Sequence, residues 1–246
     1  MNRSQMQLAT PRMTPVVKVL LILSAVIFVL QLTLEAGAGI RLSEYLGFVP
    51  ARLLSGWLWQ LVTYAFLHSG LFHLLFNLLV IWTVGSELEG LWGVKTFLSY
   101  CFVAALGGAI VYGVFSLASL GTSPYVPMVG SSGVVYGLLL AYGILFGERQ
   151  MYFFMLFPMP AKYFVMLLGG IELISSVFYS KDGVAHTAHL GGFVFGFLFL
   201  MAMAQWRQRA KNQASGGGER KKRLKKSNHL RLIRGEDDDE DPKTWN

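Results

Sequence analysis

Long apolar runs separated by short polar connections dominate the pattern of the first 205 residues. A helix needs about 20 mostly apolar residues to cross the hydrocarbon core of a bilayer. By this measure the runs predict six membrane-spanning helices, near Val16–Leu34, Leu71–Val84, Phe97–Leu120, Ser132–Phe146, Tyr163–Phe178 and His186–Met203. We therefore expect an all-α polytopic membrane protein, a bundle of six transmembrane helices with both termini on the same side.

The amino-acid composition supports the same class. Of the 246 residues, 54% are hydrophobic and only 14% are charged, whereas an ordinary soluble domain is about one-quarter charged. The single cysteine, Cys101, lies within an apolar run, so neither an internal disulfide nor a thiolate metal cluster can form. The fold must therefore rest on packing within lipid.

Charged residues divide the chain into a short N-terminal segment (1–15), a membrane domain (16–205) and a tail (206–246). The segment after Trp206 holds 12 of the 21 Lys and Arg residues and seven of the 14 acidic residues. Such a composition buries too little apolar surface to fold alone, so we expect a disordered tail. Its basic run at 219–226 favours contact with anionic lipid, and we expect no nucleic-acid partner.

Positive charges predict the orientation of the spans, because loops rich in Lys and Arg stay in the cytoplasm. The basic residues concerned are Arg3, Arg12, Lys18, Lys95, Arg149 and Lys162. Both termini are therefore predicted to be cytoplasmic. In an alternative interpretation, the first run is a signal peptide cleaved near residues 36–38. However, that run is longer than a typical signal core, and its loss would break the six-span parity.

The second, fourth and sixth predicted spans run from the outside inward, and each opens with polar residues. The second begins HSGLFHLLFN, the fourth opens with GSSG and the sixth opens with AHTAHLGG. Within the second span, Asn77 follows His73 by one helical turn, so both side chains share a face. Polar groups are costly inside a membrane and mark functional sites. We expect these three helices to bring histidine, asparagine and serine to a similar depth.

Ser132 and His189 are the residues that could carry chemistry. A serine hydroxyl is a weak nucleophile, but an imidazole within hydrogen-bond reach can take its proton as attack proceeds. Gly192, one turn after His189, begins a GxxxG groove that lets a neighbouring helix approach closely. The serine and the imidazole could therefore meet across two helices.

Acyl transfer also needs hydrogen-bond donors aimed at the oxyanion of its tetrahedral intermediate. The histidine and asparagine of the second span could supply them, together with backbone N–H groups near Ser132. Glycine on both sides of the serine pair suits a backbone that turns sharply into a helix and admits substrate. The supporting residues are Gly130, Ser131 and Gly133.

These motifs resemble those of the rhomboid intramembrane serine proteases. GSSG fits the GxSG motif of that family, and SSGVVYG resembles its nucleophile helix. HSGLFHLLFN, GSELEGLWG and AHLGGFVFG resemble its second span, the end of that span and its last helix. The resemblance extends from about Leu46 to Gly196, and the motifs occur in the order typical of the family.

The resemblance implies a catalytic dyad, with Ser132 as nucleophile and His189 as general base and without a third acidic member. It also implies that His73 and Asn77 help to stabilise the oxyanion. Tyr136, one turn after the serine, falls on the aromatic residue that packs against the catalytic imidazole. The aromatic ring would substitute in part for an orienting carboxylate.

Other positions carry over less directly. Phe76 and the fifth span fall where the family has its lateral gate for a substrate helix. Trp59 and Gln60 stand where bacterial members often carry Trp-Arg, so no role of that arginine carries over. His186 receives no catalytic role. Glu89 is expected to end the second span and to hold a loop through hydrogen bonds.

The implied function is that of an intramembrane serine endopeptidase that cleaves the transmembrane segments of single-pass membrane proteins. The expected location is a cell membrane, in the first place a bacterial cytoplasmic membrane. The alternative is a proteolytically inactive, rhomboid-like scaffold that binds membrane helices, although such relatives usually lack the serine or the histidine. A transporter is disfavoured because the two halves of the chain show no repeat.

A zinc site could in principle gather His68, His73, His186 and His189. The spacing in HSGLFH is wrong for such a site, and the glutamate of an HExxH motif is missing, so we expect neither a metal nor a cofactor. Glu172 is an ionisable residue within the fifth span and hence a functional candidate. Without an evident partner it stays outside the predicted site.

Overall fold

A computed structural model of the chain describes residues 12–53, 55–120, 122–153, 157–178 and 185–228. Its elements, in chain order, are α1 (Pro15–Ala38), α2 (Leu42–Leu46), α3 (Pro50–Leu53), α4 (Gln60–Thr63), the 3-10 turn η1 (Tyr64–Phe66), α5 (Leu71–Val80), the π-helical turn η2 (Ile81–Gly85), α6 (Ser86–Trp92), α7 (Val94–Leu117), α8 (Ser132–Leu145), β1 (Gln150–Phe153), β2 (Phe157–Pro160), α9 (Ala161–Phe178) and α10 (His186–Asn228).

Within the described residues, five helical segments are long and apolar enough to cross a membrane. They are α1, the continuous stretch Leu71–Trp92, α7, α9 and α10 as far as Gln213. The remaining apolar helix, α8, corresponds to the fourth predicted span. It has 14 residues and is about 21 Å long, shorter than the roughly 30 Å hydrocarbon core. The prediction of an all-α polytopic membrane bundle is confirmed, and α8 is shorter than each of the five helical segments that are long enough to cross.

The second predicted span is longer than expected and contains a wide turn. Its apolar run ends at Val84 and Glu89 was expected to end the span, whereas helix continues through η2 and α6 to Trp92. The Thr83 hydroxyl donates to the Leu79 carbonyl one turn earlier, a bond that loosens the local helical ladder. Gly85 faces Val17 of α1 in this region, where a Cβ atom would lie 3.3 Å from the valine side chain. The π-helical turn thus lies where α1 comes close.

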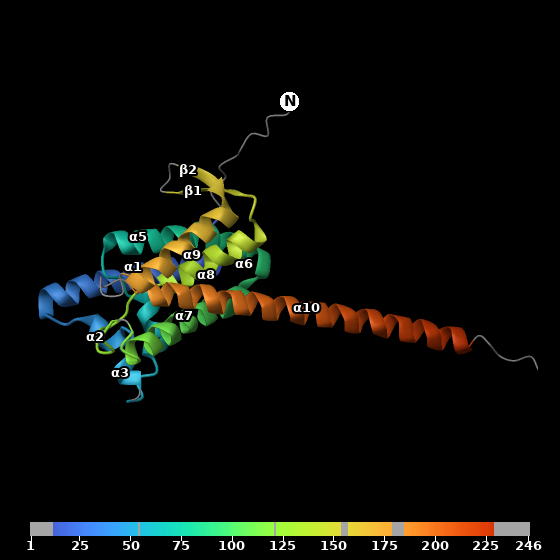
Figure 1. Ribbon diagram of the computed structural model, residues 1–246, viewed down its shortest axis with the longest axis horizontal. Coiled ribbons are helices and arrows are strands. Elements are labelled where there is room, and N and C mark those ends of the chain that lie inside the picture. The colour runs from blue at the N-terminus through green and yellow to red at the C-terminus, as the bar shows by residue number, and fades with distance from the viewer. Residues whose placement is uncertain (1–11, 54, 121, 154–156, 179–184, 229–246) are drawn as a thin grey trace, which may run out of the picture. The chain divides into compact units, whose positions relative to one another are not determined.

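Helix α8 lies at the centre of the bundle. It packs against α7, α9 and α5, and these helices run alongside one another in Figure 1. On α10, Gly192 lies against the backbone of Gly133, and Gly196 lies against Gly137. A Cβ atom on Gly192 would overlap the Gly133 carbonyl. Glycine is therefore required for α10 to approach α8 as closely as it does.

The segment that leads into α8 is held by backbone hydrogen bonds to the connection between α1 and α5. Met128 and Phe48 exchange two N–H to carbonyl bonds of 2.9 Å each. The Gly130 N–H donates to the Tyr64 carbonyl at 2.9 Å, and the Tyr64 hydroxyl donates to the carbonyl of Ala105 in α7 at 2.8 Å. Non-helical backbone at membrane depth is tolerated when its polar groups are satisfied in this way. This anchoring fixes where α8 begins.

Glu89 of α6 holds the start of α1. Its carboxylate accepts hydrogen bonds from the Thr14 hydroxyl and from the N–H groups of Val16 and Val17. The first N–H groups of a helix have no partner inside the helix, and a carboxylate there also suits the helix dipole. Glu89 therefore joins the first span to the second, and the segment that it holds is the N-terminus of a helix rather than a loop.

A short antiparallel hairpin, β1 paired with β2, connects α8 to α9. Sequence reasoning did not anticipate it. Its pairs run from Gln150 with Pro160 to Phe153 with Phe157. Just before the hairpin, Arg149 forms an ion pair with Glu87 of α6. The predicted cytoplasmic connection is therefore tied to the end of the second span.

The chain divides into two structural units, Met1–Met201 and Ala202–Asn246. Within the second unit, the described residues continue α10 to Asn228. The helix thus extends into residues 206–228, part of the segment that was predicted to be a disordered tail. Residues 229–246 lie outside the described residues, and the domain boundaries stay predictions.

Candidate active site

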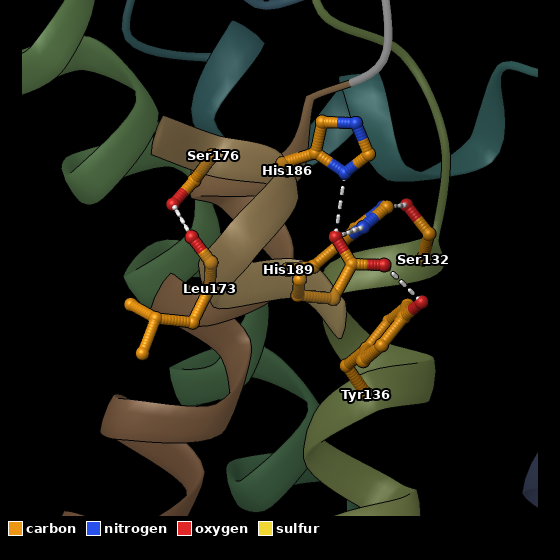
Figure 2. Close-up of polar contacts among 7 residues, drawn as sticks. Ser132, Tyr136, Leu173, Ser176, His186 and His189 are labelled. Atoms are coloured by element: carbon orange, nitrogen blue, oxygen red, sulfur yellow. Dashed lines mark hydrogen bonds and ion pairs between the residues drawn. The ribbon is translucent and has the colours of Figure 1, made fainter. Parts of the chain in front are cut away.

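Ser132 and His189 face one another across the interface of α8 and α10, as Figure 2 shows. The Nε2 atom of His189 lies 2.8 Å from Ser132 Oγ. Ser132 is the first residue of α8, so its side chain stands where the helix begins. His189 is buried, with 8% of its surface exposed. The structure therefore brings together the two residues that sequence analysis paired.

The imidazole of His189 stacks on one aromatic ring, which a second ring supports. Tyr136, one turn after Ser132, stacks on it with ring centroids 4.4 Å apart and an interplanar angle of 12°. Phe193 lies edge-on to the same tyrosine at 5.3 Å. Stacking restricts rotation of the imidazole about its side-chain bonds. The Nε2 atom is thus kept in the direction of the serine.

His73 of α5 lies beside the turn that precedes α8. Gly130 has φ of +120°, a conformation that L side chains rarely adopt. A Cβ atom on Gly130 would lie 2.6 Å from His73 Cε1 and 2.9 Å from His73 Nε2. His73 Nδ1 is 3.0 Å from the Ser69 hydroxyl. With that hydroxyl donating to Nδ1, His73 Nε2–H is directed toward the same turn.

Asn77 lies one turn after His73 and is 4% exposed. Its Nδ2 atom is buried and has no hydrogen-bond partner in the described part of the chain. A buried, unpaired amide donor costs free energy, commonly about 1–3 kcal/mol. Such a donor calls for an acceptor, and a substrate oxygen could serve as one.

The second serine of the pair has a different environment. Ser131 Oγ lies 3.4 Å from Nε2 of His68, away from the contact that Ser132 makes with His189. Gln31 of α1 holds His68 by accepting from its N–H at 3.0 Å and donating to its carbonyl at 3.3 Å. Burial, together with the neighbouring His73, lowers the pKa of His68 to about 4. His68 is therefore neutral at physiological pH.

Glu172 and His186 also belong to the cluster, although sequence analysis left both outside it. Glu172 Oε2 lies 2.7 Å from His186 Nδ1 and 3.0 Å from His189 Nδ1. The Tyr136 hydroxyl donates to Oε1 of the same carboxylate. The expectation of a dyad without an acidic neighbour is therefore incomplete, because a carboxylate contacts the far side of the imidazole.

One signal in the sequence could have indicated Glu172. It lies six residues before the end of α9 at Phe178, and His189 lies three residues after the start of α10. Adjacent antiparallel spans bring such positions to a similar depth. A carboxylate buried in lipid also requires hydrogen-bond donors, and the histidines at the start of the next span could supply them.

Glu172, His186 and His189 form a group that could hold a metal ion, with one donor atom each within 4.8 Å of the others. Two ligands of a tetrahedral zinc ion lie about 3.3 Å apart, given metal–ligand bonds of about 2.0–2.1 Å. The observed separations of 2.7 and 3.0 Å between these atoms are shorter than that. They match hydrogen-bonded histidines better than a metal centre.

Similarity to known proteins agrees with this arrangement. A family model described as the Rhomboid domain matches residues 55–206. Rhomboid protease GluP of Bacillus subtilis is 31% identical over 147 residues, which are 59% of this chain and 26% of GluP. Rhomboid protease GlpG of Serratia proteamaculans is 34% identical over 157 residues, 63% of this chain and 51% of GlpG.

GlpG of Yersinia pseudotuberculosis is 33% identical over 150 residues, 61% of this chain and 48% of that protein. The matches therefore span between about a quarter and a half of the length of these relatives. The family model, in contrast, covers more than half of the chain and includes every residue of the cluster described above. The chain belongs to the rhomboid family.

Proposed function

We propose that the chain is an intramembrane serine endopeptidase that cleaves the transmembrane segments of single-pass membrane proteins. The observation that carries the proposal is the 2.8 Å contact between Ser132 Oγ and His189 Nε2, with the imidazole stacked on Tyr136. Nucleophile and base at hydrogen-bond distance, with the base oriented by a third group, are the signature of an activated serine. The protease names of the relatives support the same class.

The proposed reaction follows from these positions. Ser132 Oγ attacks the carbonyl carbon of the scissile peptide bond while His189 Nε2 takes the hydroxyl proton. The C–N bond then breaks, and the imidazolium gives its proton to the leaving amine. Water repeats the sequence on the acyl-enzyme and releases Ser132. The buried, stacked imidazole acts as base and acid in turn without moving.

Three groups of donors are available to stabilise the oxyanion in this proposal. His73 Nε2 lies against Gly130, and Asn77 Nδ2 is buried without a partner in the described chain. The first N–H groups of α8 are free of intrahelical bonds and carry the positive end of the helix dipole. Loss of one such donor costs about 10²–10³ in kcat in a comparable site.

The substrate class follows from the surroundings of the site. A transmembrane helix hides its carbonyls in its own hydrogen bonds, so it must unwind before Ser132 can attack. Substrates with helix-loosening residues next to the cut would therefore be favoured. Phe76, which is 59% exposed, and α9 border the side from which we expect such a helix to enter.

The proposed location is the cytoplasmic membrane of a bacterium, with both termini in the cytoplasm. In this orientation α5, α8 and α10 run inward from the outer face, and the serine and histidine stand near the outer ends of their helices. The basic connections and the basic tail lie inside and can touch anionic lipid.

The experiment that tests the proposal is cleavage of a labelled single-pass substrate in liposomes. We expect Ser132→Ala and His189→Ala each to lower kcat by at least about 10³-fold, as loss of a nucleophile or base does in serine proteases. Ser131→Ala is the matched control, because Ser131 contacts His68 instead of His189. It should cleave at close to the wild-type rate.

Two outcomes would contradict the assignment. Cleavage by Ser132→Ala at the wild-type rate would show that another residue is the nucleophile. Binding of the substrate helix without cleavage by the wild type, across substrates with different residues at the cut, would instead favour an inactive scaffold.

A further inference from the structure

The carboxylate of Glu172 is contacted by Tyr136, His186 and His189. Tyr136 donates to Oε1 from the ring that stacks on His189. His189 Nδ1 lies 3.0 Å from Oε2, and His186 Nδ1 lies 2.7 Å from the same oxygen. Glu172 is 5% exposed, so these contacts replace the water that a charged carboxylate would otherwise bind.

The contact with His189 is close but not linear. Nδ1 of His189 is buried and makes no aligned hydrogen bond in the described part of the chain, and Glu172 Oε2 is the acceptor beside it. An ionised carboxylate can only accept, so a proton between these two atoms belongs to Nδ1. A neutral imidazole with a proton on Nδ1 offers its lone pair on Nε2, the atom that faces Ser132.

We propose that Glu172 is a positioning residue that keeps the Nδ1 proton on His189 and so presents Nε2 to Ser132 as a base. The inference rests on the proposed function and extends it, because the dyad gains a third member from α9. Glu172 touches neither the substrate nor the attacking oxygen. It acts through His189 directly and through the stacked ring of Tyr136.

His186 is the second histidine that contacts Oε2 of Glu172. It occupies part of the accepting capacity of Oε2 and keeps that side of the carboxylate satisfied. The arrangement differs from a metal centre in its separations of 2.7 and 3.0 Å between donor atoms. The experiments below therefore test the hydrogen-bonding role of Glu172 and include metal binding as a separate outcome.

The test compares Glu172→Gln with wild type in liposomes, using kcat, KM and the unfolding temperature. The glutamine amide can donate to Nδ1, which would move the imidazole proton to Nε2 and block the base. We expect kcat to fall by roughly 10²-fold or more with little change in KM. Glu172→Asp keeps the charge and should recover at least about tenfold of that loss. Glu35→Gln, at an exposed ion pair on α1, is the matched control.

A second readout does not depend on cleavage. Nitrogen-15 NMR of histidine-labelled wild-type protein in liposomes, with the His189 signal assigned from the His189→Gln variant, reports which ring nitrogen carries the proton. We expect Nδ1–H in the wild type and loss of that signal in Glu172→Gln. The wild-type tautomer tests the proposed position of the proton even if the variant fails to fold or the wild type proves to be no protease.

Three results would overturn the inference. The first is an Nε2–H tautomer for His189 in the wild type. The second is a Glu172→Gln variant that cleaves at the wild-type rate. The third is cleavage abolished by a chelator and restored by Zn²⁺, which would make the cluster of Glu172, His186 and His189 a metal site.

Discussion

At the scale of single residues, the buried imidazole of His68 links protonation to the stability of the fold. His68 is 1% exposed and lies against His73, and burial lowers its pKa to about 4. In the unfolded chain the same group has a pKa of about 6.5. Between these two values the unfolded state binds a proton that the folded state does not, so stability falls as pH falls through this window.

The variant His68→Gln tests this linkage. The unfolding temperature of the wild type in detergent should decrease more steeply between pH 6.5 and pH 4 than that of the variant. The variant is expected to be less stable at pH 7, because it loses packing next to Ser131. Parallel curves for the two proteins would show that folding does not lower the pKa of His68.

The polar residues of the site could be predicted from the sequence, but their contacts between helices could not. Ser132, His189, His73 and Asn77 stood out because polar groups at the start of apolar runs are costly in lipid. Glu172 was visible for the same reason, but its partners were not. Spacing reports which side chains share a face of one helix, whereas the contact between α9 and α10 depends on how two helices are rotated against each other.

At the scale of elements, close approach of helices replaces the hydrophobic effect, since lipid is as apolar as the side chains themselves. The pair α8 and α10 illustrates this, because the backbone of Gly192 lies against that of Gly133. The apolar runs predicted where most helices begin. The π-helical turn at Ile81–Gly85 and the hairpin between α8 and α9 were missed, because both arise from contacts with other elements.

Gly192→Ala should separate α8 from α10. Its methyl group would overlap the Gly133 carbonyl, and overpacking of this kind typically costs about 1–3 kcal/mol. We expect a lower unfolding temperature and slower cleavage, because the serine and the imidazole lie on the two helices. Gly170→Ala on α9, where a Cβ atom meets nothing within 4 Å, is the control. Equal stability of the two variants would contradict the interface.

At the scale of the whole molecule, the distribution of basic residues predicts which loops face the cytoplasm. Replacing Cys101 by serine removes the single cysteine, and new cysteines can then report on single loops. An impermeant maleimide added to intact cells should label Ser123→Cys, in the connection before α8. It should not label Glu148→Cys, whose native side chain is 82% exposed on the other connection. The reverse pattern would invert the topology.

Glu172 and His189 belong to different helices, and this has a consequence for the timing of hydrolysis. A displacement of α9 away from α10 would lengthen the 3.0 Å separation between the carboxylate and the imidazole. While α9 is displaced, Glu172 would no longer hold the proton on Nδ1, and His189 would act less well as a base. The base would be restored when the helix returns. Under the proposed function, a substrate helix that leaves before α9 returns would be spared, and one that remains would be cut. Residence time, rather than affinity alone, would then select what is cleaved.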